Sequence, residues 1–133
     1  MTTPYRLYAD YADDFEARVR LLLPEECGRQ LPPYNGVRWD FCYAQDRPMI
    51  SYMWLYPDFY DPETGNSLRE LPLPIDEWLH VRVAILLDAA RPFHWPRLWP
   101  GTSFYYCECN RIVAEGTVTR LTGLRKPRPQ YSH

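Results

Sequence analysis

Apolar and polar residues alternate along several short stretches of the chain, and proline-containing segments separate these stretches. A period of two is typical of β-strands that bury one face, because successive side chains of a strand point to opposite sides. Six strands of this length close naturally into a small barrel, which removes exposed edges. The pattern therefore predicts an all-β fold, a closed six-stranded antiparallel β-barrel. The predicted strands span residues 15–23, 38–43, 49–56, 78–87, 102–108 and 112–121.

The alternation also assigns an inward face to the strands. We expect one set of apolar side chains to point into the barrel or to pack on one of its ends, because a shift of register by one residue would turn them all to the solvent. The members of this set are Phe15, Val19, Phe41, Phe104, Val113 and Val118.

Turn and loop residues divide the chain into three parts. Residues 1–14 form a polar, tyrosine-bearing N-terminal arm, and residues 15–122 form the barrel domain. Residues 123–133 form a basic tail that we expect to be flexible, because it is short and terminal. Long loops are expected at residues 25–37, 57–74 and 88–100.

Length, charge and composition limit the classes of protein that fit. A chain of 133 residues has the length of a single domain. Its formal net charge of −2 gives the molecule as a whole no electrostatic attraction for nucleic acid. The 14 prolines suit ordered loops and argue against long helices. No apolar run is long enough to span a bilayer, and no secretory leader pattern opens the chain, so we expect a cytoplasmic protein.

Two similar turns lie far apart in the sequence. One is Glu26-Cys27-Gly28-Arg29, and the other is Glu108-Cys109-Asn110-Arg111. Gly and Asn adopt positive φ at low cost, so each sequence is typical of a tight turn. Because the flanking residues alternate with period two, we expect both turns to join strands.

These turns resemble the two ends of the last β-barrel domain of elongation factor Tu and its relatives among the translation GTPases. The family's opening motif is matched by Glu25, Glu26, Cys27, Gly28, Arg29, Pro32, Arg38 and Phe41, and its closing motif by Gly101, Phe104, Glu108, Cys109, Asn110, Arg111, Val113, Gly116 and Val118. The resemblance covers roughly residues 15–121 and is weak between 49 and 100. It implies an elongation factor Tu-like barrel, which in that family contacts the acceptor arm region of transfer RNA and a protein exchange partner.

The chain also departs from this family. It has no Gly-x-x-x-x-Gly-Lys-Ser/Thr sequence, so it lacks the loop that cradles nucleotide phosphates, and we expect no nucleotide. Cys replaces Gly in both turns, and Trp39 stands where the family usually has Pro. A fold does not determine the activity of the protein that carries it, so the resemblance favours a fold more strongly than a function.

The four cysteines are expected to be free, partly buried thiols. Two disulfides are the less favoured alternative in a cytoplasmic chain. A four-thiolate zinc site is a further alternative, but Cys-x-Cys is not the Cys-x-x-Cys spacing that structural zinc sites favour. We therefore expect no metal and no cofactor. The four residues are Cys27, Cys42, Cys107 and Cys109.

No group of residues in the sequence supports catalysis, so we predict that the protein is not an enzyme. The paired carboxylates of the first turn lack an evident cleft, the histidines lack metal-ligand spacing, and no serine lies in a Gly-x-Ser-x-Gly elbow. The residues considered are Glu25, Glu26, His80, His94, Ser51, Ser67 and Ser103.

Three arginines are candidates for binding an anion. Arg29, Arg38 and Arg111 are expected to line one end of the barrel, where their guanidiniums suit a phosphate or a carboxylate. The alternative is that the turn arginines satisfy strand-end carbonyls and pair with Glu26 or Glu108, three positions away.

The long loops supply a second candidate surface. Phe93, Trp95 and Trp99 lie in one loop, and aromatic side chains beside arginine are the composition of an interface hot spot. The same side chains would also serve to plug an open end of the barrel. Further aromatics flank the other long loop, namely Trp54, Tyr56, Phe59 and Tyr60.

The sequence as a whole predicts a stand-alone, non-enzymatic binding module that contacts RNA or a translation-related protein. The alternative is a small inhibitor or immunity-type protein that masks a toxin or an enzyme. The basic tail and the turn arginines favour RNA. The nearly neutral charge and the aromatic loops favour a protein partner, because nucleic-acid binders usually concentrate positive charge.

Overall fold

The computed structural model describes residues 3–27, 33–70 and 72–128; Arg29 lies outside these residues. Strands dominate the described part of the chain, and its helices are each one turn or less. The elements are β1 (Phe15–Leu21), α1 (Pro24–Cys27), β2 (Asp40–Tyr43), β3 (Pro57–Phe59), β4 (Trp78–Val83), the 3-10 helix η1 (Asp88–Ala90), α2 (Arg91–His94), β5 (Ser103–Glu108) and β6 (Arg111–Leu121).

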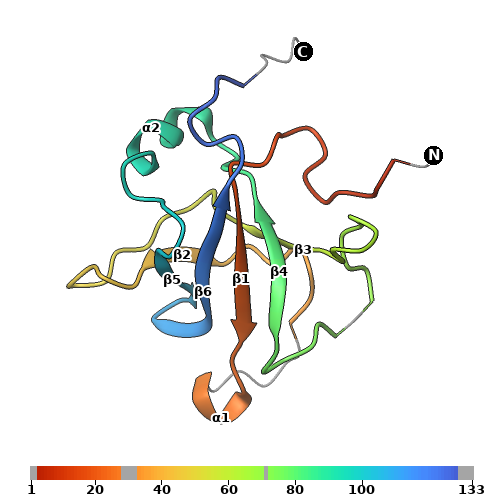
Figure 1. The fold of residues 1–133 in the computed structure, drawn as a ribbon. Coiled ribbons are helices and arrows are strands. Elements are labelled where there is room, and N and C mark those ends of the chain that lie inside the picture. Colours follow the sequence, from red (N-terminus) through yellow and green to blue (C-terminus); the bar gives the residue numbers. More distant parts are fainter. Residues whose placement is uncertain (1–2, 28–32, 71, 129–133) are drawn as a thin grey trace.

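One antiparallel sheet contains all six strands, in the order β2-β5-β6-β1-β4-β3. The sheet curves into a half-barrel, with α1 beyond one end of its long strands and α2 beyond the other (Figure 1). The predicted all-β fold is confirmed. The prediction of a closed barrel is wrong, because β2 and β3 are the two edges of the sheet and do not pair with each other.

The lengths of the edge strands explain why the barrel stays open. β2 has four residues and β3 has three, so neither offers a long ladder for closure. Each edge is instead covered by a single bridge to a nearby segment, Phe41 to Tyr52 beside β2 and Tyr60 to Ser67 beside β3. Such short, covered edges protect the sheet without closing it.

The core lies in the concave side of the sheet and confirms the predicted inward face. All six side chains predicted to point inward are at most 2% exposed. Phe41 and Phe104 stack with their ring centroids 4.7 Å apart. Gly116 makes room for this stack, because a Cβ at that position would lie 2.4 Å from Cζ of Phe104.

Some predicted elements differ from those observed. The expected strand at residues 49–56 contains only the bridge at Tyr52, and β3 lies in the expected loop at 57–74. All three residues of β3 are buried, so this strand shows no alternation. α1 and α2 lie in the other two expected loops, and a proline stands in the first turn of α2, where it favours the helical φ.

A buried ion pair holds the N-terminal arm against the β3 side of the sheet. Nε of Arg82 donates to Asp58 over 2.9 Å, and both side chains are at least nine-tenths buried. The Ser67 hydroxyl donates to the same carboxylate and accepts from the N–H of Leu7, each over 2.9 Å. The carbonyl of Tyr5 accepts from the N–H of Ser67 over 2.8 Å. We call Asp58, Ser67 and Arg82 the N-terminal clamp.

A second buried network holds residues 123–128 against the start of β1. Asp14 accepts from Nε of Arg91 over 2.9 Å and from the N–H of Ile85 over 2.6 Å, and Nη2 of Arg128 donates to the same carboxylate. Asp14 is 0% exposed. Arg91 also donates to the carbonyls of Gly123, Leu124 and Lys126. We call Asp14, Arg91 and Arg128 the C-terminal clamp.

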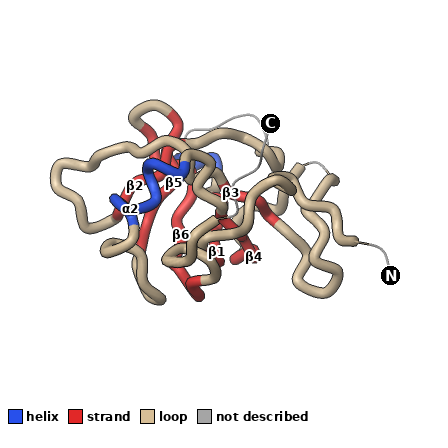
Figure 2. Tube along the Cα trace, turned by 90° about the horizontal axis from the view of Figure 1, so that it is seen from above, coloured by secondary structure: helices blue, strands red, loops and turns tan. Residues whose placement is uncertain are grey.

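α2 and the N-terminal arm, each held by one clamp, lie at different places in the molecule. α2, which begins with Arg91, lies beside β2 and β5, whereas the N-terminal arm lies beyond β3 and β4 (Figure 2). Among the described residues, none of the helices is long and apolar enough to cross a membrane.

Candidate functional site

The segment from Arg91 to Trp99 combines buried anchor residues with exposed aromatic residues. Arg91, His94 and Leu98 are buried and recur with the spacing of a helix. Phe93 and Trp95 lie between these residues and Trp99 follows Leu98; the three aromatic side chains are 51%, 37% and 55% exposed, respectively. We call these three aromatic residues the platform. The buried residues thus fix the backbone of this segment, while its large aromatic side chains remain exposed.

His94 is the central anchor of the platform. Its Nδ1 and the hydroxyl of Tyr43, at the end of β2, share a hydrogen bond of 2.6 Å. Burial lowers the pKa of His94 to about 4, and the nearby Arg97 acts in the same direction. His94 is therefore neutral at physiological pH, which suits a packed position against the aromatic core.

Arg97 connects the platform to the segment that flanks β2. Its guanidinium lies 4.2 Å from the ring centroid of Tyr43, pairs with Asp46 over 2.6 Å and donates to the hydroxyl of Tyr52 over 2.8 Å. The ring of Phe93 rests 5.2 Å from that of Tyr52, centroid to centroid. These contacts fix the orientation of Phe93 although half of its surface is in the solvent.

Arg125 adds a positive charge to the platform. Its guanidinium carbon lies 4.1 Å from the ring centroid of Trp99, and its Nη2 donates to the carbonyl of Trp95 over 2.6 Å. Residues 123–128 carry Arg125 and are held by Arg91 of the C-terminal clamp. One buried network therefore positions both the aromatic side chains and their cationic neighbour.

Of the predicted arginines, Arg38 and Arg111 are not part of the platform. Arg111 begins β6, and the platform lies near the other end of that strand, where the N–H of Gly101 donates to the carbonyl of Val118 (Figure 1). Nη2 of Arg111 lies 3.8 Å from the carboxylate of Glu108, which also accepts from Nε1 of Trp39 over 3.0 Å. The arrangement matches the alternative in which Arg111 pairs within its own turn.

Arg38 lies at the same end of the sheet as this turn, because Asp40 stands opposite Cys107 and Trp39 donates to Glu108. It is exposed just before β2, with its guanidinium carbon 5.3 Å from the ring centroid of Tyr56. Arg29 lies outside the described residues. Among the described residues, the aromatic platform therefore lies at a surface separate from Arg38 and Arg111.

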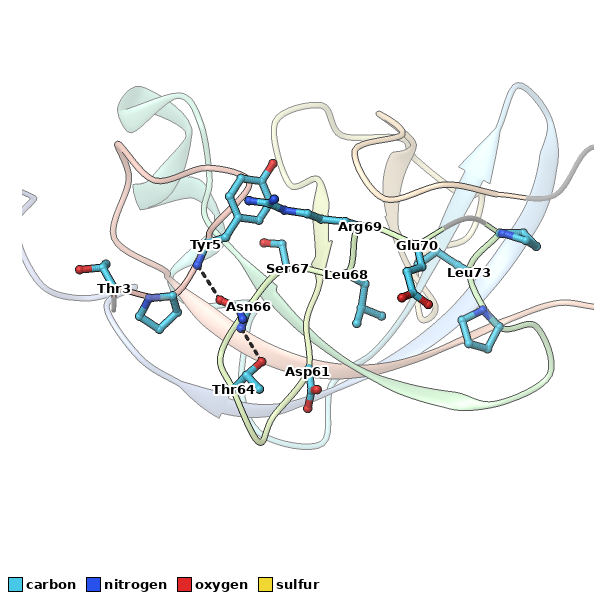
Figure 3. Close-up of a pocket in the computed structure, with 13 residues that line it drawn as sticks. Thr3, Tyr5, Asp61, Thr64, Asn66, Ser67, Leu68, Arg69, Glu70 and Leu73 are labelled. Atoms are coloured by element: carbon cyan, nitrogen blue, oxygen red, sulfur yellow. Dashed lines mark hydrogen bonds between the residues drawn. The ribbon is translucent and has the colours of Figure 1, made fainter. Parts of the chain in front are cut away.

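An open groove runs along the N-terminal arm on the opposite side of the molecule. It has a volume of about 1000 Å³, and the arm and residues 61–74 supply its described walls. Figure 3 shows the guanidinium of Arg69 stacked on the ring of Tyr5, 3.6 Å from the ring centroid, above Asn66 and Asp61. The backbone N–H of Tyr5 donates to the side chain of Asn66 over 2.7 Å. We call this feature the arm groove.

The chemistry of the arm groove favours binding over catalysis. Ser67 is 4% exposed, and its hydroxyl forms hydrogen bonds with Leu7, Asp58 and Arg82. The hydroxyl is therefore not an available nucleophile. The guanidinium of Arg69 forms no ion pair with any described residue, so its donors face the solvent. An anionic group is the ligand that such an arginine would accept.

Sequence reasoning missed the arm groove and Arg125. The groove joins residues about sixty positions apart, and nothing local in the sequence signals that contact. The signal for the platform was stronger, because three large aromatic residues occur within a segment of seven.

Among the residues that the structure describes, no cluster of three or more His, Cys, Asp or Glu side chains could hold a metal ion. Comparison with models of protein families and with curated proteins finds no match to this chain.

Proposed function

We propose that this chain is a non-enzymatic binding module that recognises a protein partner through the platform formed by Phe93, Trp95 and Trp99. The observation that carries the proposal is the contrast between exposed side chains and an anchored backbone. Large aromatic residues in the solvent lose the free energy that burial provides, about 2 kcal/mol or more each. A protein partner that covers them recovers that free energy.

Preorganisation makes the platform suitable for tight binding. Arg91, His94 and Leu98 are at most 5% exposed, so the backbone beneath the aromatic side chains is fixed before a partner arrives. A fixed interface loses less conformational freedom on association. Tryptophan and arginine are also the residues most often found at hot spots, and Trp99 and Arg125 form such a pair here.

The class of partner follows from the two alternatives that the sequence leaves open. The resemblance to the last barrel domain of elongation factor Tu favours a translation-related protein. The alternative of an inhibitor or immunity-type protein requires only that a toxin or enzyme bind the same surface. Both alternatives place a protein on the platform, and they differ in which protein it is.

RNA is the second candidate partner, and one observation favours it. Arg38 and Arg69 each lie over a tyrosine ring and form no ion pair with a described residue. Arginine and aromatic side chains together suit unpaired bases and phosphates. The formal net charge of −2 weighs against this candidate.

The test compares two tryptophans of similar exposure at different places. Trp99 belongs to the platform and is 55% exposed, whereas Trp78 begins β4, pairs with Arg20 and is 49% exposed. The wild type, Trp99→Ala and Trp78→Ala are used to isolate binding proteins from the source cell. Each protein recovered is then purified and titrated by calorimetry against the three forms.

We expect a one-to-one complex that Trp99→Ala weakens by about 30-fold or more, since a hot-spot tryptophan contributes about 2 kcal/mol or more. Trp78→Ala should change the affinity less than twofold. Circular dichroism checks that both variants fold. Equal binding by both variants would show that the platform is not the interface.

A parallel titration with a labelled single-stranded RNA tests the second candidate. Binding by RNA predicts a steep loss of affinity with salt and a further loss in Arg69→Ala, with Arg18→Ala on the exposed face of β1 as the control. RNA binding that is lost in Arg69→Ala while Trp99→Ala is normal would replace the platform proposal.

A further inference from the structure

Two buried thiols meet on the outer face of the sheet. Cys42 lies on β2 and Cys107 on the neighbouring strand β5, and they are 0% and 2% exposed. Phe41 and Tyr106, their neighbours in sequence, point into the core, so strand alternation turns both cysteines to the opposite face. Neither cysteine belongs to the hydrophobic core cluster.

The register of the two strands places these thiols on a diagonal. Cys42 stands opposite Tyr105, and Cys107 stands opposite Asp40. An irregularity between Tyr106 and Cys107 interrupts the pairing of β5 with β6, and such irregularities increase the local twist of a strand. The two Sγ atoms are 3.1 Å apart. A disulfide requires an approach of only about 1 Å more, to about 2.05 Å.

The surroundings of the pair shift the pKa values of the two thiols in opposite directions. A hydrogen bond from Cys107 lowers the pKa of Cys42 to about 7, and a hydrogen bond with Ser51 acts in the same direction. The same hydrogen bond and burial raise the pKa of Cys107. Cys42 is therefore the thiol that ionises near neutral pH, and Cys107 keeps its proton.

We propose that Cys42 and Cys107 are a redox modification site, which hydrogen peroxide converts into a reversible disulfide between β2 and β5. The thiolate of Cys42 attacks one oxygen of peroxide, the O–O bond breaks, and Cys42 becomes a sulfenic acid while hydroxide leaves. Sγ of Cys107 then attacks Sγ of Cys42. The S–O bond breaks, and the proton of Cys107 leaves with the second oxygen as water.

The two steps together convert two thiols and one molecule of hydrogen peroxide into one disulfide and two molecules of water. Both thiols are buried and oxidation of a thiol follows its exposure, so the reaction requires the edge strand β2 to open transiently and admit peroxide. Because β2 pairs with β5 on one side and with Tyr52 only through a single bridge on the other, the disulfide would fix one edge of the sheet.

The experiment uses the complete chain with Cys27→Ser and Cys109→Ser, so that only the proposed pair can react. The reduced protein is treated with hydrogen peroxide, quenched, unfolded and alkylated, and the mass and the linked peptides are determined. We expect the loss of two hydrogen atoms, a cross-linked peptide containing Cys42 and Cys107, and recovery of both thiols with a reductant. The rate should rise with pH with a midpoint near 7.

The unaltered chain provides a test that does not depend on how the variants fold. Treated in the same way, it should show the same cross-linked peptide, and Cys42→Ala should lose it. Three outcomes would each overturn the proposal. They are oxidation confined to Cys109, a cross-link between other cysteines, and thiols of Cys42 and Cys107 that are still free when all the peroxide has been consumed.

Discussion

The N-terminal and the C-terminal clamp each hold one end of the chain against the sheet through a buried carboxylate, but they differ in the number of guanidiniums that face it. In the N-terminal clamp, Asp58 faces one guanidinium, that of Arg82, and a hydroxyl completes the network. In the C-terminal clamp, Asp14 faces the two guanidiniums of Arg91 and Arg128. Buried charges require partners, so a clamp with two cations on one carboxylate depends more heavily on that carboxylate.

The two clamps also support different surfaces. The N-terminal clamp fixes the arm and with it one wall of the arm groove. The C-terminal clamp fixes Arg91 at the start of α2 and residues 123–128, which together frame the platform. Burial raises the pKa of Asp14, although the N–H of Ile85 and both guanidiniums act in the opposite direction. Disturbing one clamp should therefore affect one surface and spare the other.

The largest effect is expected for Asp14→Ala. This change leaves two buried guanidiniums without their carboxylate and should lower the free energy of unfolding by about 4 kcal/mol. Urea denaturation measures the loss. The matched control is Asp88→Ala, because Asp88 pairs with Arg128 but its side chain is 65% exposed. The control should cost less than about 1 kcal/mol. Equal losses in both variants would contradict a special role for Asp14.

A smaller effect is expected for Asp58→Ala, which leaves only one buried guanidinium. We expect the free energy of unfolding to fall by about 3 kcal/mol, and proteolysis to cut the N-terminal arm sooner. The double variant Asp58→Leu/Arg82→Met removes both charges and should regain part of the loss. The comparison between clamps fails if Asp58→Ala is as destabilising as Asp14→Ala, or if binding through the platform is lost with it.

Acid should weaken the platform side through His94. Its folded pKa of about 4 lies below the value of 6.5 that applies to the unfolded chain. Between these values the unfolded state binds a proton that the folded state does not, so the contribution to stability is complete above pH 6.5 and is lost as pH falls towards 4. The loss between pH 7 and pH 5 should be about 2 kcal/mol.

His94→Gln tests this pH dependence, because glutamine does not titrate. Its free energy of unfolding should vary less between pH 7 and pH 5 than that of the wild type, whatever the cost of the substitution at pH 7. His80→Gln serves as the control, since His80 is only partly buried, and burial lowers its pKa as well. If the free energy of unfolding of His94→Gln depends on pH as steeply as that of the wild type, the dependence arises from another group.

The smallest effect concerns the rim of the arm groove. Arg69→Ala removes the cation over the ring of Tyr5 and should cost about 0.5 kcal/mol, because the pair is exposed. Thermal denaturation and proteolysis of the arm detect the change. Arg18→Ala, at an exposed position of β1, should have no effect on the arm. An unchanged arm in Arg69→Ala would mean that the clamp alone holds it.

The sequence was most informative where strands bury one face and expose the other. Phe15 and Val19 on β1 alternate with polar or exposed residues, and both are buried as predicted. The prediction failed at β3, because a strand buried on both faces has no period of two. It failed at α2 because proline was taken as a loop signal, although proline also suits the first turn of a helix.

The two similar turns show the limit of local sequence. In the second, Cys109 adopts a φ of 56° between β5 and β6, which are neighbours in the sheet. In the first, Pro24–Cys27 is a helical turn, and the strands on either side of it, β1 and β2, are not neighbours. Glu26 and Cys27 therefore differ in backbone conformation from Glu108 and Cys109, because strand pairing is decided by contacts remote in sequence. The arm groove and both clamps depend on such remote contacts as well.

The platform carries its own optical probe. Trp95 and Trp99 stand in the solvent, while Trp39 is 3% exposed and bonded to Glu108. An indole shielded from water emits at shorter wavelength than one in contact with it. A partner that covers the platform should therefore shift the intrinsic fluorescence of the unlabelled protein to the blue, and a dye-free titration can follow complex formation at the surface itself.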